Sequence, residues 1–422
     1  MRSSAERLTA ARLLVRVEGG AFSSRLLAGG TVPGVRARVL GVQRWMRALD
    51  AVLEPLLRRD LGKLDPEVRA TLRMGLFETM RMDLPPALAT DGAVRLVRRL
   101  GCSSAAGMVN AVLRKASVGW RERLAQASID IQLAHPAWLW GRWRENFGAE
   151  PAERAMAAAQ EPAATWVWFL LEEAKAALRE EGVALLPHPW CPGAWSAPED
   201  PRRLIQEVKA GSAYAQDPSS QLVAHVALAL GGDSARLLDL CAAPGGKSAL
   251  MLRLGGWSRT AAADLRLTRV RLMRPLLERM DATVVVAADA TQAPFAAGAW
   301  DLVLLDAPCT GTGTFRRHPE LKWRLRPEAV GEMAARQRRL FLAGLELVAP
   351  GGALLYATCS VEPEENEEVV ADLPAGFEPV DLETALPDNV PWRPTEASGI
   401  RILPCKDGDG FTMHAVRRLS LA

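Results

Sequence analysis

The fold class is indicated most directly by residues 236–247, which read RLLDLCAAPGGK. The mainly apolar run Arg236–Leu240 predicts a buried strand, the Ala-Pro-Gly-Gly segment predicts a tight turn, and Lys247–Leu254 predicts a helix. The same alternation continues as far as Ala357. We expect further strands at Thr260–Ala263, Thr283–Ala288, Asp301–Leu305 and Ala353–Ala357, and further helices at Leu267–Met280 and Pro327–Val348. Near-continuous apolar strands alternating with helices are typical of a parallel sheet covered on both faces, here an α/β Rossmann-like domain.

Unusual residues gather at the predicted carboxyl ends of these strands. In an open α/β sheet, ligands bind at that edge, near the point where the strand order reverses. The segments that follow the strands are Cys241–Lys247, Asp264, Asp289, Asp306–Cys309 and Thr358–Ser360. The sequence therefore predicts one site along a single edge of the sheet.

The glycine turn does not match a phosphate-binding motif. A P-loop needs a glycine at position 241, which is cysteine, and the dinucleotide pattern G-x-G-x-x-G is absent. What remains is a turn whose backbone N–H groups open toward a ligand at a helix N-terminus. Two glycines alone fit a plain strand-to-helix turn equally well.

Three aspartates extend this predicted site. Asp264 ends the second strand, where a carboxylate can bind a ribose diol, and Asp289 ends the third, where it can accept a hydrogen bond from an adenine amino group. A single strand-end aspartate is more often a helix cap. Three in series, with Asp306, are the arrangement expected for S-adenosylmethionine, which has no phosphate to bind. The predicted cofactor-binding residues are Cys241, Ala242, Ala243, Pro244, Gly245, Gly246, Lys247, Asp264, Asp289 and Asp306.

Two cysteines, Cys309 and Cys359, each follow a predicted buried strand. One strand-end cysteine is usually a small core residue, but two beside a cofactor turn suggest covalent catalysis. Methylation of carbon-5 of a pyrimidine requires an unreactive carbon to become nucleophilic. A thiolate that adds to carbon-6 achieves this by forming an enamine, and a second group must then remove the carbon-5 proton.

The first 130 residues are predicted to form an all-α bundle. Val68, Leu72, Leu76 and Met80 recur at four-residue steps before Pro85-Pro86 ends the pattern. This part carries 22 Lys and Arg against 12 Asp and Glu, a net charge of +10, whereas the remainder carries −7. The imbalance fits a polyanion-binding module joined to a catalytic module, and it fits a basic surface kept for solubility equally well.

Domain boundaries and compartment follow from the remaining features. We expect a helical domain at 1–130, a mixed linking subdomain at 131–215 and the catalytic domain at 216–422. No apolar run is long enough to span a membrane, and the arginine-rich amino terminus lacks the apolar core and cleavage site of a signal peptide. Six scattered cysteines with no C-x-x-C pair argue against a zinc site and a disulfide framework. We therefore expect a cytoplasmic monomer with no metal and no membrane partner.

The motifs resemble the RNA cytosine-5 methyltransferases. They comprise Asp239–Lys247, Asp306–Gly313, Thr358–Ser360, Glu362–Glu367, Gln216–Gln221 and Gly408–Phe411. The helical part, with VNAVLR at residues 109–114, resembles the antitermination-factor-B-like RNA-binding domain. The pairing is similar to the bacterial small-subunit ribosomal RNA methyltransferase B family. This resemblance covers nearly the whole chain and is weakest around residues 150–205.

The resemblance implies methylation of carbon-5 of a cytosine in RNA, with small-subunit ribosomal RNA as the expected target. It implies Cys359 as the nucleophile, Cys309 as the residue that assists product release, and Asp306 as the group that hydrogen-bonds the cytosine ring. DNA cytosine methyltransferases use the Pro-Cys thiol as nucleophile, so the presence of both thiols favours the RNA type. The same chemistry on another RNA, such as tRNA, and a catalytically idle RNA-binding protein remain open.

Basic residues interleaved with a tryptophan follow Cys309 directly. Beside a catalytic loop they are expected to hold phosphates and stack an unpaired base, although a solvated charged loop is the ordinary alternative. The target base must be flipped or unpaired to reach the site. Residues 166–169 read WVWF where the family commonly carries an arginine and an asparagine, so a polar RNA contact there is lost or moved. The predicted RNA-binding residues are Arg114, Arg316, Arg317, Lys322 and Arg324, with Lys322 and Arg324 the best candidates.

Overall fold

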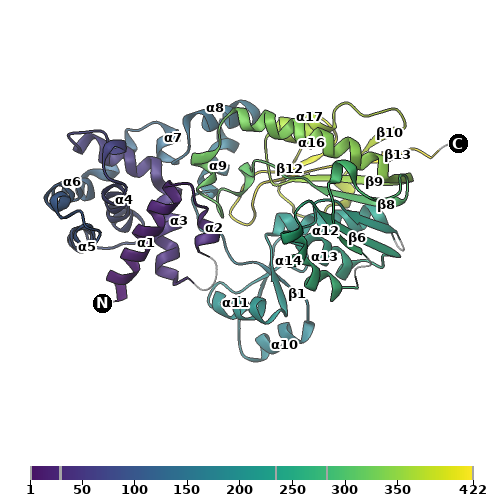
Figure 1. The fold of residues 1–422 in the computed structure, drawn as a ribbon, viewed down its shortest axis with the longest axis horizontal. Coiled ribbons are helices and arrows are strands. Elements are labelled where there is room, and N and C mark those ends of the chain that lie inside the picture. Colours follow the sequence, from purple (N-terminus) through teal and green to yellow (C-terminus); the bar gives the residue numbers. More distant parts are fainter. Residues whose placement is uncertain (1, 28–30, 233–234, 282–283, 421–422) are drawn as a thin grey trace. The chain divides into compact units, whose positions relative to one another are not determined.

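The computed structural model describes residues 2–27, 31–232, 235–281 and 284–420, and Figure 1 shows its helices and strands. Thr283, the first residue of one predicted strand, lies outside the described residues. The chain divides into two compact units. Unit 1 comprises Met1–Pro162 and Phe315–Leu325, and unit 2 comprises Ala163–Thr314 and Arg326–Ala422. Within the described ranges, no helix combines the length and apolarity that a bilayer crossing requires.

Unit 1 contains only helices among its described residues, as the sequence predicts. Val68, Leu72, Leu76 and Met80 are all buried, because residues four positions apart lie on one face of a helix. The helices are α1 (Arg2–Glu18), α2 (Ser23–Leu26), α3 (Pro33–Leu53), η1 (Glu54–Leu56), η2 (Leu61–Lys63), α4 (Pro66–Arg81), α5 (Pro86–Arg99), η3 (Ser103–Ala105), α6 (Ala106–Ala125), α7 (Ile129–Gln132), α8 (Ala137–Phe147), α9 (Ala149–Ala158) and α15 (Leu321–Arg324). Buried residues of α1, α3, α4, α5 and α6 form one apolar core.

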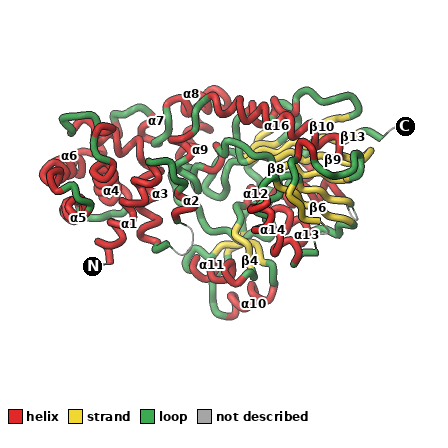
Figure 2. Tube along the Cα trace, in the orientation of Figure 1, coloured by secondary structure: helices red, strands yellow, loops and turns green. Residues whose placement is uncertain are grey.

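Unit 2 is built around a large sheet, drawn in yellow in Figure 2. Its strands are β5 (Arg236–Asp239), β6 (Arg259–Asp264), β7 (Val284–Ala287), β8 (Trp300–Asp306), β9 (Val348–Thr358), β10 (Phe377–Val380), β11 (Trp392–Pro394), β12 (Ile400–Ile402) and β13 (Phe411–Arg418). The strand order is β11-β12-β13-β9-β8-β5-β6-β7, and β10 also pairs with β13. The five strands expected from the sequence, β5 to β9, pair in parallel.

The sheet as a whole is mixed, because four further strands that the sequence analysis did not predict, β10 to β13, join the five parallel ones. β13 pairs antiparallel with β9, and β10 and β12 pair antiparallel with β13. These later strands follow β9 without the long helical crossovers that a parallel connection needs. They cover the edge of β9 that would otherwise expose a row of unpaired backbone groups.

Helices cover both faces of this sheet, as Figure 1 shows. They are α12 (Pro218–Gly231), α13 (Gly246–Leu254), α14 (Leu267–Glu278), α16 (Glu328–Leu347) and α17 (Glu367–Val370). Leu237 packs in the core with α12, α13 and α14, whereas the next residue, Leu238, packs in the core with α16 and α17. The two residues point to opposite faces because side chains alternate along a strand.

A second, smaller sheet has the order β2-β3-β1-β4 and also belongs to unit 2. Its strands are β1 (Val167–Phe169), β2 (Leu186–Pro187), β3 (Trp195–Ser196) and β4 (Ala213–Ala215), accompanied by α10 (Glu172–Glu180) and α11 (Pro201–Ala210). The residues expected to form one linking subdomain, 131–215, are therefore divided between the two units. Helices α7 to α9 lie in unit 1, and the small sheet lies in unit 2.

Two glycines bring the loop after Cys309 against the loop that precedes β13. Gly313 N–H donates to the carbonyl oxygen of Cys359 at 3.0 Å, and Gly410 N–H donates to the carbonyl oxygen of Gly313 at 2.8 Å. A Cβ atom on Gly313 would lie 2.2 Å from the carbonyl oxygen of Gly410. Because a backbone atom is in the way, no side chain fits at position 313, and this contact fixes the segment that carries Cys309.

We expect Gly313→Ala to lower the free energy of unfolding by about 2–3 kcal/mol, since overpacking against backbone forces the two loops apart. Thermal and denaturant unfolding of the purified protein measure this change. Gly331→Ala is the matched control, because an added Cβ there meets nothing within 4 Å. Within α16 that substitution should stabilise by up to about 1 kcal/mol. Equal unfolding midpoints for the two variants would contradict the close contact between Gly313 and the Gly410 carbonyl oxygen.

Candidate active site

The two predicted catalytic thiols meet at the carboxyl edge of the large sheet. β8 and β9 are parallel neighbours, with Asp306 opposite Ala357, so the segments that follow them leave the sheet side by side. Ala307 N–H donates to the carbonyl oxygen of Ala357 at 2.9 Å, which extends the pairing by one residue. The sulfur atoms of Cys309 and Cys359 lie 3.3 Å apart, within hydrogen-bonding distance. Both cysteines are partly exposed.

A partly buried ion pair lies beside the thiols. Lys247 Nζ donates to Asp306 Oδ2 at 2.7 Å. Burial lowers the pKa of Lys247, but the negative charges of Asp306, of the Cys359 thiolate and of Asp239 outweigh it and raise that pKa above its ordinary value. The ammonium group therefore stays charged next to the position where a thiolate at Cys359 would form.

The glycine turn joins β5 to α13 as the sequence predicts. Ala242 N–H donates to the carbonyl oxygen of Ala263 at 2.9 Å, which ties the turn to the end of β6. Gly245 has φ +100°, a left-handed conformation that glycine adopts without strain. A Cβ on Gly246 would lie 2.5 Å from the ring of Tyr214. Cys241 and Lys247 are partly exposed, Ala242 and Ala243 are buried, and Pro244 is exposed on the turn.

The two remaining predicted aspartates differ in their surroundings. Asp264 is buried at the end of β6, where its carboxylate accepts the backbone N–H of Arg266 at 3.1 Å and pairs with the Arg269 guanidinium at 3.1 Å. Asp289 is exposed and caps the short helix η4 (Ala290–Gln292) by accepting the backbone N–H of Thr291 at 2.9 Å. Asp289 therefore has the capping role that strand-end aspartates often take, and its role in adenine binding stays a prediction.

Asp239 is a candidate site residue that the sequence argument did not single out. Its Oδ2 accepts a hydrogen bond from Ser248 Oγ at 2.6 Å, whereas Oδ1 is buried and has no hydrogen-bond partner among the described residues. Burial, together with the nearby charge of Asp306, raises the pKa of Asp239 to about 7. A buried acceptor without a donor, beside a helix N-terminus, fits a ligand that brings its own N–H group. Only its position within the glycine-turn motif could have indicated Asp239 from the sequence.

The basic segment after Cys309 has a different role from the one expected. Arg316 and Lys322 are buried within unit 1, which contradicts the prediction that they bind RNA. Lys322 is 1% exposed, and its ammonium group donates to the carbonyl oxygens of Arg44 at 3.0 Å and Ala134 at 2.9 Å. Burial, and secondarily the charge of Arg44, lower the pKa of Lys322 well below its ordinary value.

Neighbouring residues of the segment are fixed in the same way. Trp323 Nε1 donates to the carbonyl oxygen of Gln43 at 2.7 Å, and Arg324 donates to the carbonyl oxygen of Val17 at 3.0 Å. Phe315 stacks on Trp143 with ring centroids 6.1 Å apart. These side chains therefore anchor residues 315–325 within unit 1, because each donor is hydrogen-bonded to a backbone carbonyl of that unit.

Other predicted RNA contacts lie nearer the surface. Arg114 is exposed on α6, and Arg317 is partly exposed. Trp166 and Trp168, in the stretch that departs from the family pattern, are buried in unit 2, where Trp168 Nε1 donates to Gln216 Oε1 at 2.9 Å. That stretch is therefore a packing element, and the RNA roles of Arg114 and Arg317 remain predictions.

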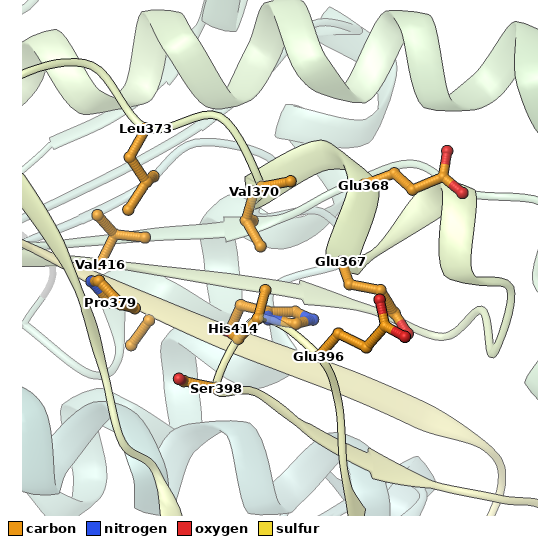
Figure 3. Close-up of a pocket in the computed structure, with 12 residues that line it drawn as sticks. Glu367, Glu368, Val370, Leu373, Pro379, Glu396, Ser398, His414 and Val416 are labelled. Atoms are coloured by element: carbon orange, nitrogen blue, oxygen red, sulfur yellow. Dashed lines mark hydrogen bonds between the residues drawn. The ribbon is translucent and has the colours of Figure 1, made fainter.

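A cavity of about 510 Å³ lies in another part of unit 2, between α17, β10, β13 and the loop before β12. Figure 3 shows the side chains that surround it. It is lined by Glu367, Glu368, Val370, Ala371, Leu373, Pro379, Glu396, Ala397, Ser398, His414, Ala415 and Val416. None of the predicted site residues is among them, so this cavity is separate from the thiols and the glycine turn.

Comparison with known proteins agrees with this description. The family described as 16S rRNA methyltransferase RsmB/F matches residues 226–417, and the NusB family matches residues 4–117. The ribosomal RNA small subunit methyltransferase B of Xylella fastidiosa (strain 9a5c) is 33% identical over 422 residues, which cover 96% of this chain and 98% of that protein. Its namesake from Vibrio cholerae is 31% identical over 338 residues, 77% of each chain.

Two solved structures share the fold. A crystal structure of PH0851 has a TM-score of 0.76 at 22% identity and covers 98% of each chain. The structure of NSun6 from Pyrococcus horikoshii with SFG has a TM-score of 0.56 at 20% identity, covering 68% of this chain and 99% of that chain.

The α/β sheet, its glycine turn and the helical unit together define an S-adenosylmethionine-dependent methyltransferase with a NusB-type domain. The residues at the turn fit this cofactor, since they offer backbone N–H groups, a buried unpaired carboxylate oxygen and a strand-end aspartate, and no phosphate-binding motif. On the strength of its relatives, the chain belongs to the ribosomal RNA small subunit methyltransferase B family.

We expect Lys322→Met to lower the stability of unit 1 by about 1–3 kcal/mol, because it removes the two buried hydrogen bonds that the ammonium group donates to Arg44 and Ala134. Thermal unfolding followed by circular dichroism measures the change. Lys115→Met is the matched control, since Lys115 is exposed on α6 and its replacement should shift stability by less than about 0.5 kcal/mol. If Lys322→Met left the unfolding midpoint unchanged and abolished RNA affinity, the original prediction that Lys322 binds RNA would be correct.

We expect Asp239→Asn to stabilise the ligand-free protein by on the order of 2 kcal/mol at pH 8. The folded-state pKa of Asp239, about 7, lies above the ordinary value of 3.8. This group therefore favours folding most below pH 4, and its contribution falls as the pH rises from 4 to 7. The gain from Asn should accordingly shrink as the pH falls from 7 toward 4.

The same substitution should weaken binding of S-adenosylhomocysteine at least tenfold at pH 8, as measured by isothermal titration calorimetry. Asp388, which is exposed, provides the control, because Asp388→Asn should change neither the stability nor the affinity for S-adenosylhomocysteine. Tight ligand binding by Asp239→Asn at pH 8 would show that the unpaired oxygen does not contact the cofactor.

Proposed function

We propose that this protein methylates carbon-5 of a cytosine in small-subunit ribosomal RNA through a covalent bond between Cys359 and carbon-6 of the base. The observation that carries the proposal is that the two sulfur atoms lie 3.3 Å apart at the carboxyl edge of the sheet, where the glycine turn also lies. Ring nitrogens and ribose oxygens already carry nucleophilic lone pairs, so their methylation needs no thiol. A ring carbon does need activation, and a sulfur nucleophile supplies it.

The surroundings of the two thiols support different roles for them. Cys359 lies close enough to Lys247 for a thiolate there to raise the pKa of the ammonium group. Conversely, the hydrogen bond with Cys359, burial and the negative charges of Cys359, Glu365 and Asp306 raise the pKa of Cys309 well above its ordinary value. Cys309 thus keeps its proton and donates it toward Cys359, which is the thiol better placed to become the nucleophile.

The proposed reaction starts when Cys359 sulfur donates an electron pair to carbon-6 of the flipped cytosine. The electrons of the carbon-5–carbon-6 double bond shift to the bond between carbon-4 and carbon-5, which gives an enamine with a nucleophilic carbon-5, while Asp306, held by Lys247, hydrogen-bonds the ring. S-adenosylmethionine, when bound, supplies an electrophilic methyl group to carbon-5. Cys309 then takes the carbon-5 proton, the electrons of that C–H bond restore the double bond, and Cys359 leaves as a thiolate.

The proton transfer to Cys309 has a physical cause in this arrangement. While Cys359 is a thiolate, its charge and hydrogen bond keep Cys309 protonated. Once Cys359 has formed the bond to carbon, that negative charge is gone, and the pKa of Cys309 falls. Cys309 can then lose its first proton to solvent and accept the proton from carbon-5.

The RNA target is supported by the family and by the helical unit. Relatives that align with most of the chain are named ribosomal RNA small subunit methyltransferases, and the NusB family matches residues 4–117. The first 130 residues carry a net charge of +10, which favours association with a phosphate backbone. The base must leave its stack to reach the thiols, which is easiest in an unpaired segment.

We expect Cys359→Ala to reduce methyl transfer from labelled S-adenosylmethionine to unmodified small-subunit ribosomal RNA by at least about 10³-fold, because the carbon is no longer activated. We expect Cys309→Ala to accumulate a protein–RNA adduct that survives denaturation, because the carbon-5 proton is not removed. Gel mobility under denaturing conditions and nucleoside analysis for 5-methylcytidine measure the two outcomes.

Cys102→Ala is the control thiol variant, since Cys102 lies in unit 1. Parallel reactions with tRNA distinguish another RNA target, and absence of transfer to either RNA would favour a catalytically idle RNA-binding protein. Full transfer by Cys359→Ala would overturn the mechanism, and an adduct formed by Cys359→Ala in place of Cys309→Ala would exchange the roles of the two thiols.

A further inference from the structure

Glu365 is a fully buried carboxylate in the segment that follows Cys359. It lies at the end of the short helix η6 (Pro363–Glu365), and its backbone carbonyl accepts the Tyr356 hydroxyl at 2.6 Å. No ion pair to Glu365 occurs among the residues that the structure describes. Burial raises its pKa, although four hydrogen bonds to the carboxylate oppose that shift. A buried carboxylate without a cation is destabilising unless its oxygens are well bonded, so its presence here calls for a role.

Each carboxylate oxygen of Glu365 accepts two hydrogen bonds. Oε1 accepts the backbone N–H of Thr310 at 2.8 Å and the side-chain amide of Gln337, on α16, at 3.0 Å. Oε2 accepts the hydroxyl groups of Thr310 and Ser360. The acceptor capacity of an ionised carboxylate is thereby filled.

These partners are the residues next to the two thiols. Thr310 follows Cys309, and Ser360 follows Cys359. One carboxylate therefore ties together the two loops that carry the sulfur atoms. A second link reinforces the first, since Thr312 Oγ1 lies 3.1 Å from Ser360 Oγ and accepts the backbone N–H of Val361 at 3.1 Å.

We infer that Glu365 is the positioning residue of this active centre: its carboxylate clamps the loops after β8 and β9 so that both sulfur atoms reach one base. The inference rests on the proposed function for its catalytic meaning, but the clamp itself is a property of the free protein. Without it, the backbone hydrogen bonds at Ala307 and Gly313 and the link from Thr312 would be left to hold the two loops together, and none of them involves a charged group. Loop geometry matters because a displacement of about 1 Å can lower the rate of a reaction 10²-fold.

The charge of Glu365 also acts on Cys309. It is one of the negative charges that raise the pKa of that thiol, after the hydrogen bond with Cys359, burial and the Cys359 charge. The titratable and charged groups that act on Cys309 directly are Cys359, Glu365, Asp306 and Tyr356. Lys247, from the glycine turn, acts on Asp306 and Cys359. Removal of the Glu365 charge should therefore shift the titration of Cys309 downward, which a purely structural clamp would not do.

Two substitutions separate the clamp from the charge. Glu365→Ala removes both. Glu365→Gln keeps the side-chain length and removes only the charge, since its amide oxygen can accept from Thr310 and Gln337 while its NH₂ group donates to the two hydroxyl oxygens. Glu368→Ala, at an exposed position of α17, is the matched control.

The first test measures how well the thiols are held together. The reduced protein is equilibrated with glutathione disulfide, which forms the Cys309–Cys359 disulfide and releases two molecules of glutathione, and peptide mapping gives the equilibrium constant. We expect Glu365→Ala to lower this constant at least tenfold, and Glu365→Gln and Glu368→Ala to lie within about threefold of the parent. Circular dichroism confirms that each variant is folded, and Glu365→Asp, which shortens the side chain by one methylene, replaces Glu365→Ala if that variant does not fold.

The second test measures the charge effect. In a Cys359→Ala background, the rate of Cys309 alkylation by iodoacetamide is followed from pH 6 to 10. We expect Glu365→Gln to move the midpoint to lower pH, while Glu368→Ala leaves it in place. Unchanged thiol exchange in Glu365→Ala, or in Glu365→Asp, would overturn the clamp, and an unchanged alkylation midpoint in Glu365→Gln would overturn the effect of its charge on Cys309.

The outcomes also separate this inference from the proposed function. If the parent protein transfers no methyl group to RNA but its thiol exchange depends on Glu365, then the proposed function fails and the clamp stands. If the parent transfers methyl groups and neither transfer nor thiol exchange changes in the Glu365 variants, then the clamp fails and the proposed function stands.

Discussion

The parallel pairing of β8 with β9 is the constraint on which the site depends. Parallel neighbours end at the same edge of a sheet, so the segments after Asp306 and Thr358 leave it together, and the sulfur atoms of Cys309 and Cys359 come to lie 3.3 Å apart. The two cysteines are not neighbours in the sequence, since they lie fifty positions apart with the helix α16 between them. The antiparallel strand β13 lies on the other side of β9 and covers that edge. The loop before β13 supplies Gly410, which packs against Gly313 in the Cys309 loop. The chemistry therefore follows from strand order before any single side chain is considered.

Several charged groups are buried or partly buried at the carboxyl edge of the sheet, and the pKa of each depends on the charges of its neighbours. Asp239, Lys247, Asp306 and Glu365 would all be unfavourable in isolation, because a low-dielectric surrounding disfavours unpaired charge. Lys247 neutralises Asp306 at 2.7 Å, whereas Asp239 has a pKa of about 7 and one unpaired oxygen. Folding thus leaves unsatisfied groups where the cofactor is expected to bind, which is common at functional sites, where stability is exchanged for preorganisation.

For residues 315–325, amino-acid composition alone predicts the wrong role. Its arginines, lysine and tryptophan have the composition of an RNA-binding loop, yet Lys322, Trp323 and Arg324 donate to backbone carbonyls of unit 1. A long cationic side chain can satisfy several carbonyl groups at once, so it can serve as a buried anchor as readily as a phosphate ligand. The consequence is that the polypeptide between the Cys309 loop and α16 belongs to the helical unit.

The sequence by itself determined the alternation of strands and helices, the glycine turn at residues 241–247 and the placement of both cysteines after strands. These are local features, set by hydrophobic periodicity and by the backbone freedom of glycine. Only the tertiary structure decided that β8 and β9 are neighbours, that β13 makes the sheet mixed, that Lys322 is buried and that Asp239 and Glu365 have raised pKa values. Each of these depends on residues far apart in the chain. Glu365 is hydrogen-bonded to Thr310 and Gln337, and Lys322 is hydrogen-bonded to the carbonyl groups of Arg44 and Ala134. Burial and hydrogen bonding between such residues exist only after folding, so no local pattern can encode them.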